Sequence, residues 1–451
     1  MNTAFHDHFL TRLTAAAQTL ADPRPRDKFR ALGLGLVCGD GPKTITSALT
    51  WNRHTDRDWS ADYRVLSQAQ WEPAAIFQPL AQELLAHPLL AGPYVIVAQD
   101  DTLAHKTGRK IPGTMYARDP LGPHFQANLV WAQRFVQTSL LCRPAGSAHP
   151  WRALPLAFTH APCPKIPKTG TPEELQTAKE TRKKQRLSVV ASGDLADVRA
   201  ALDRLPGGAA RRLLAVVDGS YANRTYCDAL PANTDVVARM RKDAALRAHL
   251  PVEQRVGARK YGADLPTPKE LLADAARPVH SCTAFVAGAG RTVRFKEITG
   301  VCWPKVSGDR PVRLLLLKPA GYRVRKGSKL AYRDPAYLVT TDLTTPAAEL
   351  IAAYLGRWEV EVNFRDEKTV LGVGQAQVWS ARAVSRAPAL LVACYSMLLW
   401  SAIAVYGDQR TADFGPLPRW RKQAPVRPST RELVGLLRRQ ATAGEATAKR
   451  S

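Results

Sequence analysis

The sequence predicts an α/β fold, in which a mixed β-sheet with flanking helices is interrupted by a β-rich insertion and preceded by a helical N-terminal domain. Three observations support this prediction. Two short runs of aliphatic and β-branched residues each lead into an aspartate. A segment rich in proline, glycine and basic residues, with short β-like runs, follows the second of them. A helical segment beyond it carries a glutamate bracketed by a tyrosine and cations.

Residues 1–90 have the patterning of short helices separated by turns. An amphipathic FHDHFLTRLTAAAQTLA comes first, and KTITSALTW and SADYRVLSQAQW follow. Such a series suits a helix-turn-helix-like module that binds DNA. A purely structural helical cap fits the pattern equally well. We therefore expect a helical DNA-binding region here, with the structural alternative left open.

Alternating strands and helices are predicted for the first part of the core, at 91–241. The run from Tyr94 to Ala98 is short, apolar and β-branched, which indicates a buried strand with Asp100 and Asp101 at its C-terminal end. The following elements are expected to be two strands (125–141 and 151–160), a basic stretch that leads into a helix (165–205), a strand from Leu213 to Val217 that ends in Asp218, and a strand at 234–241.

A β-rich insertion is expected at 242–343, because this segment is rich in Pro, Gly and basic residues and contains runs such as RPVRLLLLK. The second part of the core is placed at 344–407. It begins with a long helix, for which Thr345 is the expected N-cap and Pro346 the first helical residue. A basic tail, 408–451, completes the chain.

The segment PALLVACYSMLLWSAIAVYG is nearly long enough to cross a bilayer. It contains Pro388, Ser396 and Ser401, and a lone span does not suit so basic a chain. We interpret 388–407 as a helix that is buried on all sides, and we expect no membrane partner.

Charge and cysteine usage narrow the functional class. The chain carries 64 Lys and Arg against 39 Asp and Glu, a formal net charge of +25, which favours a polyanionic partner and above all nucleic acid. The seven cysteines include no C-x-x-C pair, so a zinc site or a disulfide framework is not expected. This pattern and the absence of a signal-peptide pattern at the N-terminus predict a cytoplasmic location.

Several residues of types common in active sites lie in YLGRWEVEVNFRDEK, where Tyr354, Arg357, Glu361 and Lys368 form the pattern Y-x2-R-x3-E-x6-K. On one continuous helix these positions fall within roughly 60° of one face. That face could hold a metal through Glu361 and a phosphate through Arg357 and Lys368. Arg357, Glu361 and Arg365 also have the i, i+4, i+8 spacing of an ordinary solvent-facing ladder of ion pairs. This segment alone therefore does not distinguish a functional site from such a ladder.

Three carboxylates occupy comparable places along the chain. Asp101 and Asp218 each end a predicted strand, and Glu361 lies on a helix after the insertion. Acids at the carboxyl ends of neighbouring strands gather at one edge of a sheet. Hard oxygen ligands suit Mg²⁺ or Mn²⁺, and two such ions promote cleavage of a phosphodiester bond. The order of the elements is that of a ribonuclease H-like fold.

Together these elements resemble a bacterial insertion-sequence DDE transposase of the group that carries the Y-R-E-K signature. The matching segments are QDDT (99–102), VVDGSYAN (216–223) and YLGRWEVEVNFRDEK (354–368), and the resemblance covers most of 90–405. In this family a β-rich insertion separates the second aspartate from the glutamate.

The resemblance implies a role for each matching residue. The catalytic, metal-binding triad would be Asp101, Asp218 and Glu361, with two Mg²⁺ (or Mn²⁺) ions. Asp100 is the alternative first member; Asp101 is preferred because the acid directly before the threonine resembles the catalytic one. The implied contacts with DNA phosphates are Tyr354, Arg357, Arg365 and Lys368.

The resemblance also implies an activity and partners. The protein would bind the terminal inverted repeats of a transposon, cut the double-stranded DNA and join the freed ends to target DNA, as a homodimer on paired ends close to the nucleoid. Two rivals remain. One is a transposase-derived DNA-binding or regulatory protein without cleavage activity. The other is a hydrolase of small substrates, which explains neither the charge nor the cations of the Y-R-E-K pattern.

Overall fold

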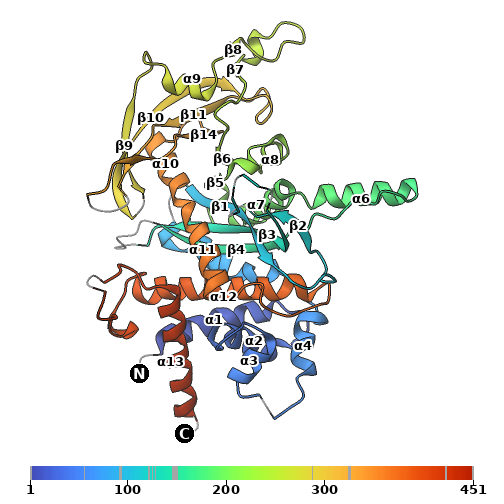
Figure 1. Ribbon diagram of the computed structural model, residues 1–451. Coiled ribbons are helices and arrows are strands. Elements are labelled where there is room, and N and C mark those ends of the chain that lie inside the picture. The colour runs from blue at the N-terminus through green and yellow to red at the C-terminus, as the bar shows by residue number, and fades with distance from the viewer. Residues whose placement is uncertain are drawn as a thin grey trace. The chain divides into compact units, whose positions relative to one another are not determined.

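The computed structural model describes residues 3–54, 56–90, 94–119, 122–123, 125–126, 128–144, 151–286, 288–323, 327–421 and 424–448 (Figure 1). The chain divides into two compact units. The first unit comprises Met1–Gly92, Asp101–Val190 and Glu359–Ser451, and the second comprises Pro93–Asp100 and Ala191–Trp358. The chain therefore leaves one unit for the other in the middle of an element, as in strand β1 (Tyr94–His105).

Helices make up most of the first unit. The predicted helical patterning of 1–90 is observed as α1 (Ala4–Gln18), α2 (Arg26–Cys38), α3 (Ile45–Trp51), α4 (Ser60–Ser67) and α5 (Gln78–Ala86). Helix α12 (Ala383–Tyr406) packs against α1, α2 and α4, and α13 (Thr430–Ala448) packs against α1, α2 and α12 (Figure 1). The N-terminal helices thus share one core with the C-terminal helices.

Helix α12 contains the apolar segment 388–407 almost entirely. Among the described residues it is the one helix whose length and hydropathy would allow it to cross a membrane. Its most apolar window is 83% buried, against other elements of the first unit. This packing agrees with the interpretation of the segment as a core helix.

The sheet of the first unit is antiparallel. Strand β3 (Leu129–Cys142) pairs with β2 (Met115–Arg118) and with β4 (Arg152–His160). Strands β3 and β4 correspond to the two strands predicted at 125–141 and 151–160. The rings of Phe135 and Phe158 stack between β3 and β4 with centroids 4.6 Å apart. Strand β4 lies against α12, which buries one face of this sheet. Helix α6 (Pro172–Lys184) follows β4.

The second unit contains a mixed sheet in the order β1-β5-β6-β14-β11-β10-β7-β8, with β9 paired to β10. Strands β1, β5 and β6 are parallel, whereas β14, β11, β10 and their further neighbours run antiparallel. The remaining strands of this unit are β5 (Arg212–Val217), β6 (Thr234–Arg239), β7 (Leu246–Ala248), β8 (Asp264–Leu265), β9 (His280–Val286), β10 (Ala289–Cys302), β11 (Val312–Leu317), β12 (Gly321–Tyr322), β13 (Ala331–Tyr332) and β14 (Ala336–Thr340). The prediction of a mixed α/β fold is confirmed.

The remaining helices are short or link the units. The α-helices are α7 (Leu187–Asp203), α8 (Arg224–Asp228), α9 (Pro268–Ala273), α10 (Ala347–Gly356) and α11 (Trp358–Thr369). The 3₁₀ helices are η1 (Ala75–Phe77), η2 (Pro88–Leu90), η3 (Gly208–Ala210), η4 (Gly219–Tyr221), η5 (Val252–Gln254) and η6 (Ala412–Phe414).

The segment 242–343 is rich in β-strands, as predicted, and it extends the sheet of the second unit. Its last strand, β14, pairs with β6, with Leu338 opposite Arg239. Figure 1 shows β9, β10, β11 and β14 together with α9 and α10, in yellow and orange. Because β14 bonds directly to β6, this segment shares a hydrogen-bonded sheet with the strands that precede it.

Strand β1 is longer than its apolar run predicted, because it continues through Asp100 and Asp101 to His105. The parallel ladder with β5 ends at Gln99, opposite Val217. Beyond that point β1 has β3 as a neighbour, and the Lys106 amide donates to the carbonyl oxygen of Trp131 at 2.9 Å. The prediction that the two acids end the strand was therefore wrong: they lie within it, on alternate faces.

The predicted long helix is divided into α10 and α11. The break lies at Arg357, whose amide bonds to the Tyr354 carbonyl at 3.1 Å, in an i to i−3 pattern that follows the weak helix former Gly356. Helix α10 also begins one residue later than predicted, because its N-cap is Pro346 and not Thr345. Asp342 accounts for this shift, because its carboxylate accepts a hydrogen bond of 2.9 Å from the backbone amide of Thr345 and holds that residue outside the helix.

Candidate functional site

Helix α11 is fixed to the first unit through one polar face. Glu359 forms an ion pair with Arg427 at 2.8 Å, and the Asn363 amide donates to the carbonyl oxygen of Ala153 on β4 at 3.1 Å. One turn later, Asp366 accepts a hydrogen bond of 2.6 Å from Thr430 at the start of α13. All three α11 side chains are buried. Their spacing of i, i+4 and i+7 makes them one face of the helix, which sets the direction of the other face.

The other face of α11 carries three residues of the predicted site, Glu361, Arg365 and Lys368, which have the same i, i+4, i+7 spacing. Partial desolvation lowers the pKa of Lys368, and the neighbouring carboxylates of Glu367, Glu361, Asp119 and Asp101 oppose this shift. Asp101 on β1 and Glu361 on α11 therefore both act on the same ammonium group within the first unit. Lys368 is itself exposed, and its Nζ lies 5.9 Å from the ring centroid of Phe364.

Arg365 is turned to a different partner. Its guanidinium pairs with the adjacent Asp366 at 2.9 Å, and 65% of its side chain is exposed. It is the member of the predicted phosphate-contacting set that the structure places in an ion pair on the surface of α11.

The second unit holds the other members of the predicted site. The parallel β1–β5 ladder ends at Gln99 and Val217. Asp100 comes next on β1, and Asp218 directly follows β5 as the N-cap of η4. The guanidinium of Arg357 donates to Asp100 in an ion pair, and both side chains are 14% exposed. Asp100, the alternative first acid, is thus neutralised by a cation of the Y-R-E-K pattern.

Tyr354 lies in the same part of the second unit. Burial raises the pKa of its phenol, Arg357 and Arg239 lower it, and Asp218 raises it further. The Arg357 guanidinium carbon lies 5.9 Å from the centroid of the Tyr354 ring. These couplings bring Tyr354, Arg357 and Asp218 into one electrostatic environment. Arg239, the last residue of β6, belongs to it as well.

The predicted site therefore consists of two groups of side chains, one in each unit. The first unit contains Asp101, Glu361 and Lys368, and the second contains Asp218, Tyr354 and Arg357. Within either unit, the described residues include no cluster of three His, Cys, Asp or Glu side chains that could hold a metal ion. The groups are joined covalently, since Asp100 and Asp101 are consecutive residues of β1.

A family model described as DDE superfamily endonuclease matches residues 19–300, more than half of the chain. The chain belongs to the DDE superfamily endonucleases. No curated protein matches it. The matched region contains Asp101 and Asp218 and ends before α10, so the family supports a nuclease or transposase type of function for the part of the chain that carries these two aspartates.

DDE superfamily endonucleases generally use divalent metal ions, and the candidate ligands of this member fit such ions chemically. Asp101, Asp218 and Glu361 offer only carboxylate oxygens, which Mg²⁺ and Mn²⁺ prefer, and none of the three is fully buried. In the first unit, the charges of Asp101 and Glu361 both oppose the desolvation that lowers the pKa of Lys368.

Two acidic residues near the site escaped the sequence prediction. Asp119 follows β2 and acts on Lys368, but nothing in a single sequence distinguishes it from a loop aspartate. Glu367 stands next to Lys368 in the sequence, and its side chain is only 1% exposed. The apolar residues Val360 and Phe364 could have indicated this burial, because Glu367 lies seven and three residues after them, on the same face of the helix.

The buried carboxyl of Glu367 should make the stability of the protein depend on pH. Burial raises the pKa of its carboxyl from 4.5 to about 8, against the opposing effects of a hydrogen bond from Gln137 and the charge of Lys368. Between these two values the folded state binds a proton that the unfolded state has released, so this group makes stability fall as pH rises and has no further effect above the folded pKa. The loss is at most ~1.4 kcal/mol per pH unit.

Glu367→Gln should therefore flatten the pH dependence of the free energy of unfolding, measured with urea from pH 5 to pH 9. Glu349→Gln, the same chemical change at an exposed position of α10, is the matched control and should keep the wild-type slope. An unchanged slope in Glu367→Gln would show that the carboxyl is ionised in the folded protein.

Proposed function

We propose that this DDE superfamily endonuclease is an insertion-sequence transposase of the Y-R-E-K group. It binds the terminal inverted repeats of its element in double-stranded DNA, cleaves the DNA at those ends and transfers the ends to target DNA. The observation that carries this proposal is the match of residues 19–300, which contain Asp101 and Asp218, to the DDE superfamily endonucleases, in a chain where the charges of Asp101 on β1 and Glu361 on α11 both act on Lys368. The proposal includes a homodimer on paired ends and a location in the cytoplasm, at the nucleoid.

The roles of the side chains follow from their chemistry. Asp101, Asp218 and Glu361 would hold two Mg²⁺ or Mn²⁺ ions, which when bound activate a water and stabilise the leaving oxygen in phosphodiester cleavage. Lys368 and Arg357 would contact the phosphates next to the scissile bond, and the Tyr354 hydroxyl would donate a hydrogen bond to one of them. The same acids serve both steps, because the freed 3′-hydroxyl then attacks a phosphodiester of the target.

In this proposal the Asp100–Arg357 ion pair positions the guanidinium before DNA arrives. A cation already held by a carboxylate loses little conformational freedom when a phosphate binds it. Lys368 has a similar arrangement, since Glu361 and Asp101 stabilise its charge although desolvation lowers its pKa. Arg365, which pairs with Asp366 on an exposed surface, is assigned the outermost phosphate contact.

The test is cleavage by the wild-type protein. Duplexes that contain the terminal inverted repeats flanking its gene should be cut at the element ends in Mg²⁺, and Mn²⁺ should replace Mg²⁺. Removal of divalent ions with EDTA should stop cleavage, and excess Mg²⁺ should restore it. If no such duplex is cut in either metal while binding to the repeats persists, the protein is a transposase-derived DNA-binding or regulatory protein.

A further inference from the structure

The basic stretch 165–186 is not used by the site described above. It contains seven Lys and Arg residues against three Glu residues. In the first unit its central part forms α6, none of whose residues is buried. A Thr171–Glu174 capping box begins the helix, acidic side chains occupy its first turn, and Arg182, Lys183 and Lys184 occupy its last turn. This segregation of charge follows the helix dipole and places the cations at one end.

Four exposed cations form a stripe at the end of α6: Lys179, Arg182 and Lys183 lie on the helix, and Arg186 lies just beyond its last residue, Lys184. The three on the helix have the spacing i, i+3 and i+4 of neighbours on one helix face. Like charges at this spacing repel each other by about 0.2–0.5 kcal/mol per pair, and none of the four forms an ion pair with a described residue. The acid within the turn, Glu180, accepts a hydrogen bond of 2.8 Å from Gln176 instead.

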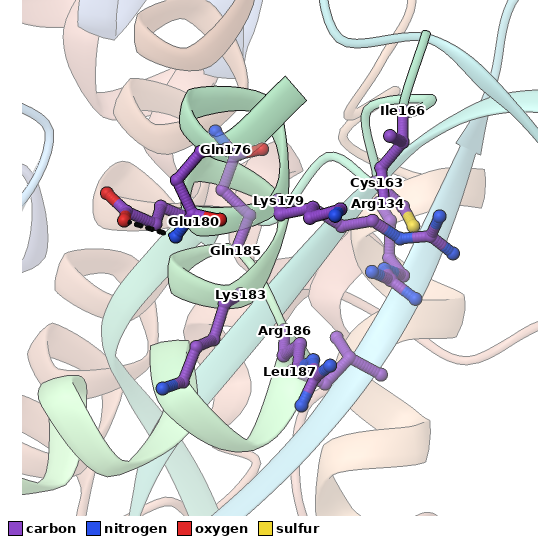
Figure 2. Close-up of a pocket in the computed structure, with 11 residues that line it drawn as sticks. Arg134, Cys163, Ile166, Gln176, Lys179, Glu180, Lys183, Gln185, Arg186 and Leu187 are labelled. Atoms are coloured by element: carbon purple, nitrogen blue, oxygen red, sulfur yellow. Dashed lines mark hydrogen bonds between the residues drawn. The ribbon is translucent and has the colours of Figure 1, made fainter. Parts of the chain in front are cut away.

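The stripe borders a hollow in the first unit, with a volume of about 800 Å³. Figure 2 shows its lining, which includes Lys179 and Lys183 from α6 and Arg134 from β3. Arg134 is held in place, because its Nε donates to the carbonyl oxygen of Ala161 at 3.1 Å. The lining contains five cations, Arg134, Lys179, Arg182, Lys183 and Arg186, and one acid, Glu180. An elongated anion with regularly spaced charges complements this surface.

We propose that this stripe of four cations and the hollow that it borders bind the phosphate backbone of double-stranded DNA. This surface is separate from the residues assigned to cleavage. This inference rests on the proposed function, because that function makes DNA the polyanion the protein meets. From Lys179 to the last helical residue, Lys184, the helix rises by ~7.5 Å. Duplex DNA carries about four phosphate charges over that length, so each cation of the stripe finds a phosphate within reach. Contacts of this kind position the duplex and carry no sequence information.

The experiment compares binding of a duplex of random sequence by two variants and the wild type, in EDTA so that no cleavage occurs. In the first variant Lys179, Arg182, Lys183 and Arg186 are all changed to Gln, which keeps helix propensity at exposed positions. In the control, four exposed cations of the second unit are changed to Gln: Arg259, Lys260, Lys269 and Arg291. Fluorescence anisotropy at several salt concentrations gives the affinity and its salt slope, and circular dichroism checks folding.

The stripe variant should bind at least ~10-fold more weakly than the wild type at low salt. Its slope of log affinity against log salt should be smaller in magnitude by about 3.6, which is about 0.9 for each of the four cations. The control should retain most of the wild-type affinity and slope. An equal loss of affinity in both variants would assign the effect to net charge and overturn the inference. Wild-type affinity in the stripe variant would overturn it as well. Failure of the wild type to cleave in Mg²⁺ would overturn the proposed function and leave this binding comparison intact.

Discussion

Glu361→Gln should abolish metal-dependent cleavage of DNA that carries the element ends while leaving binding of that DNA intact. The substitution removes the charge of a proposed metal ligand and keeps its size. Loss of even an outer-shell partner of a metal ligand costs ~10–100-fold, so loss of the ligand itself should reduce the rate by at least ~100-fold. Glu361 lies on the face of α11 opposite the buried Glu359, Asn363 and Asp366, so the helix should keep its place.

The measurements are strand cleavage in Mg²⁺ under single-turnover conditions and a gel shift in EDTA with the same duplex. Glu349→Gln provides the same chemical change on an exposed part of α10 and should cleave at the wild-type rate. Cleavage by Glu361→Gln at a rate close to the wild type would mean that this glutamate is not a metal ligand. Loss of both binding and cleavage would point to a folding defect, which urea denaturation would reveal.

Asp101→Asn should also abolish cleavage, whereas Asp100→Asn should retain a measurable part of it. The two acids lie on alternate faces of β1, and they have different partners. Asp100 is paired with Arg357, so its substitution releases a cation of the proposed phosphate contact and should slow cleavage moderately. The charges of Asp101 and Glu361 both raise the pKa of Lys368, so Asp101 shares an electrostatic environment with another proposed metal ligand.

Arg357→Gln and the double variant with Asp100→Asn complete a cycle that separates these roles. If Asp100 serves only to hold Arg357, the double variant should be no slower than Arg357→Gln alone, because the two residues act as one unit. Independent, additive losses would give Asp100 a role of its own. The opposite ranking, with Asp101→Asn active and Asp100→Asn inactive, would transfer the first triad position to Asp100.

Strands and helices that depend on residues close together in the chain were predictable from the sequence. The alternating or continuous apolar runs around Val95, Phe135, Leu156 and Leu214 predicted β1, β3, β4 and β5, because strand formation follows the burial of every second or of every side chain. The largely apolar segment 388–407 predicted a helix buried on all sides. Asp101 and Asp218 could be singled out because each follows such a run, and the family match includes both of them.

Contacts between distant segments set the features that the sequence did not predict. The end of β1 was misplaced because pairing next to β3, not the local apolar run, carries that strand through Asp100 and Asp101 to His105. The helix start was misplaced by one residue because the Asp342 carboxylate binds the Thr345 amide. The single face expected for Tyr354, Arg357, Glu361 and Lys368 was divided because α10 ends at Gly356 and α11 begins at Trp358.

The sequence by itself determined the chemistry of this protein: the residue types of the proposed site, their order and a charge of +25. Only the tertiary structure decided which of these residues are neighbours. It paired Arg357 with Asp100 and brought the charges of Asp101 and Glu361 to act on Lys368. The physical reason is that an ion pair or a shared electrostatic environment depends on distances in space, which strand pairing and helix packing set over hundreds of residues of chain.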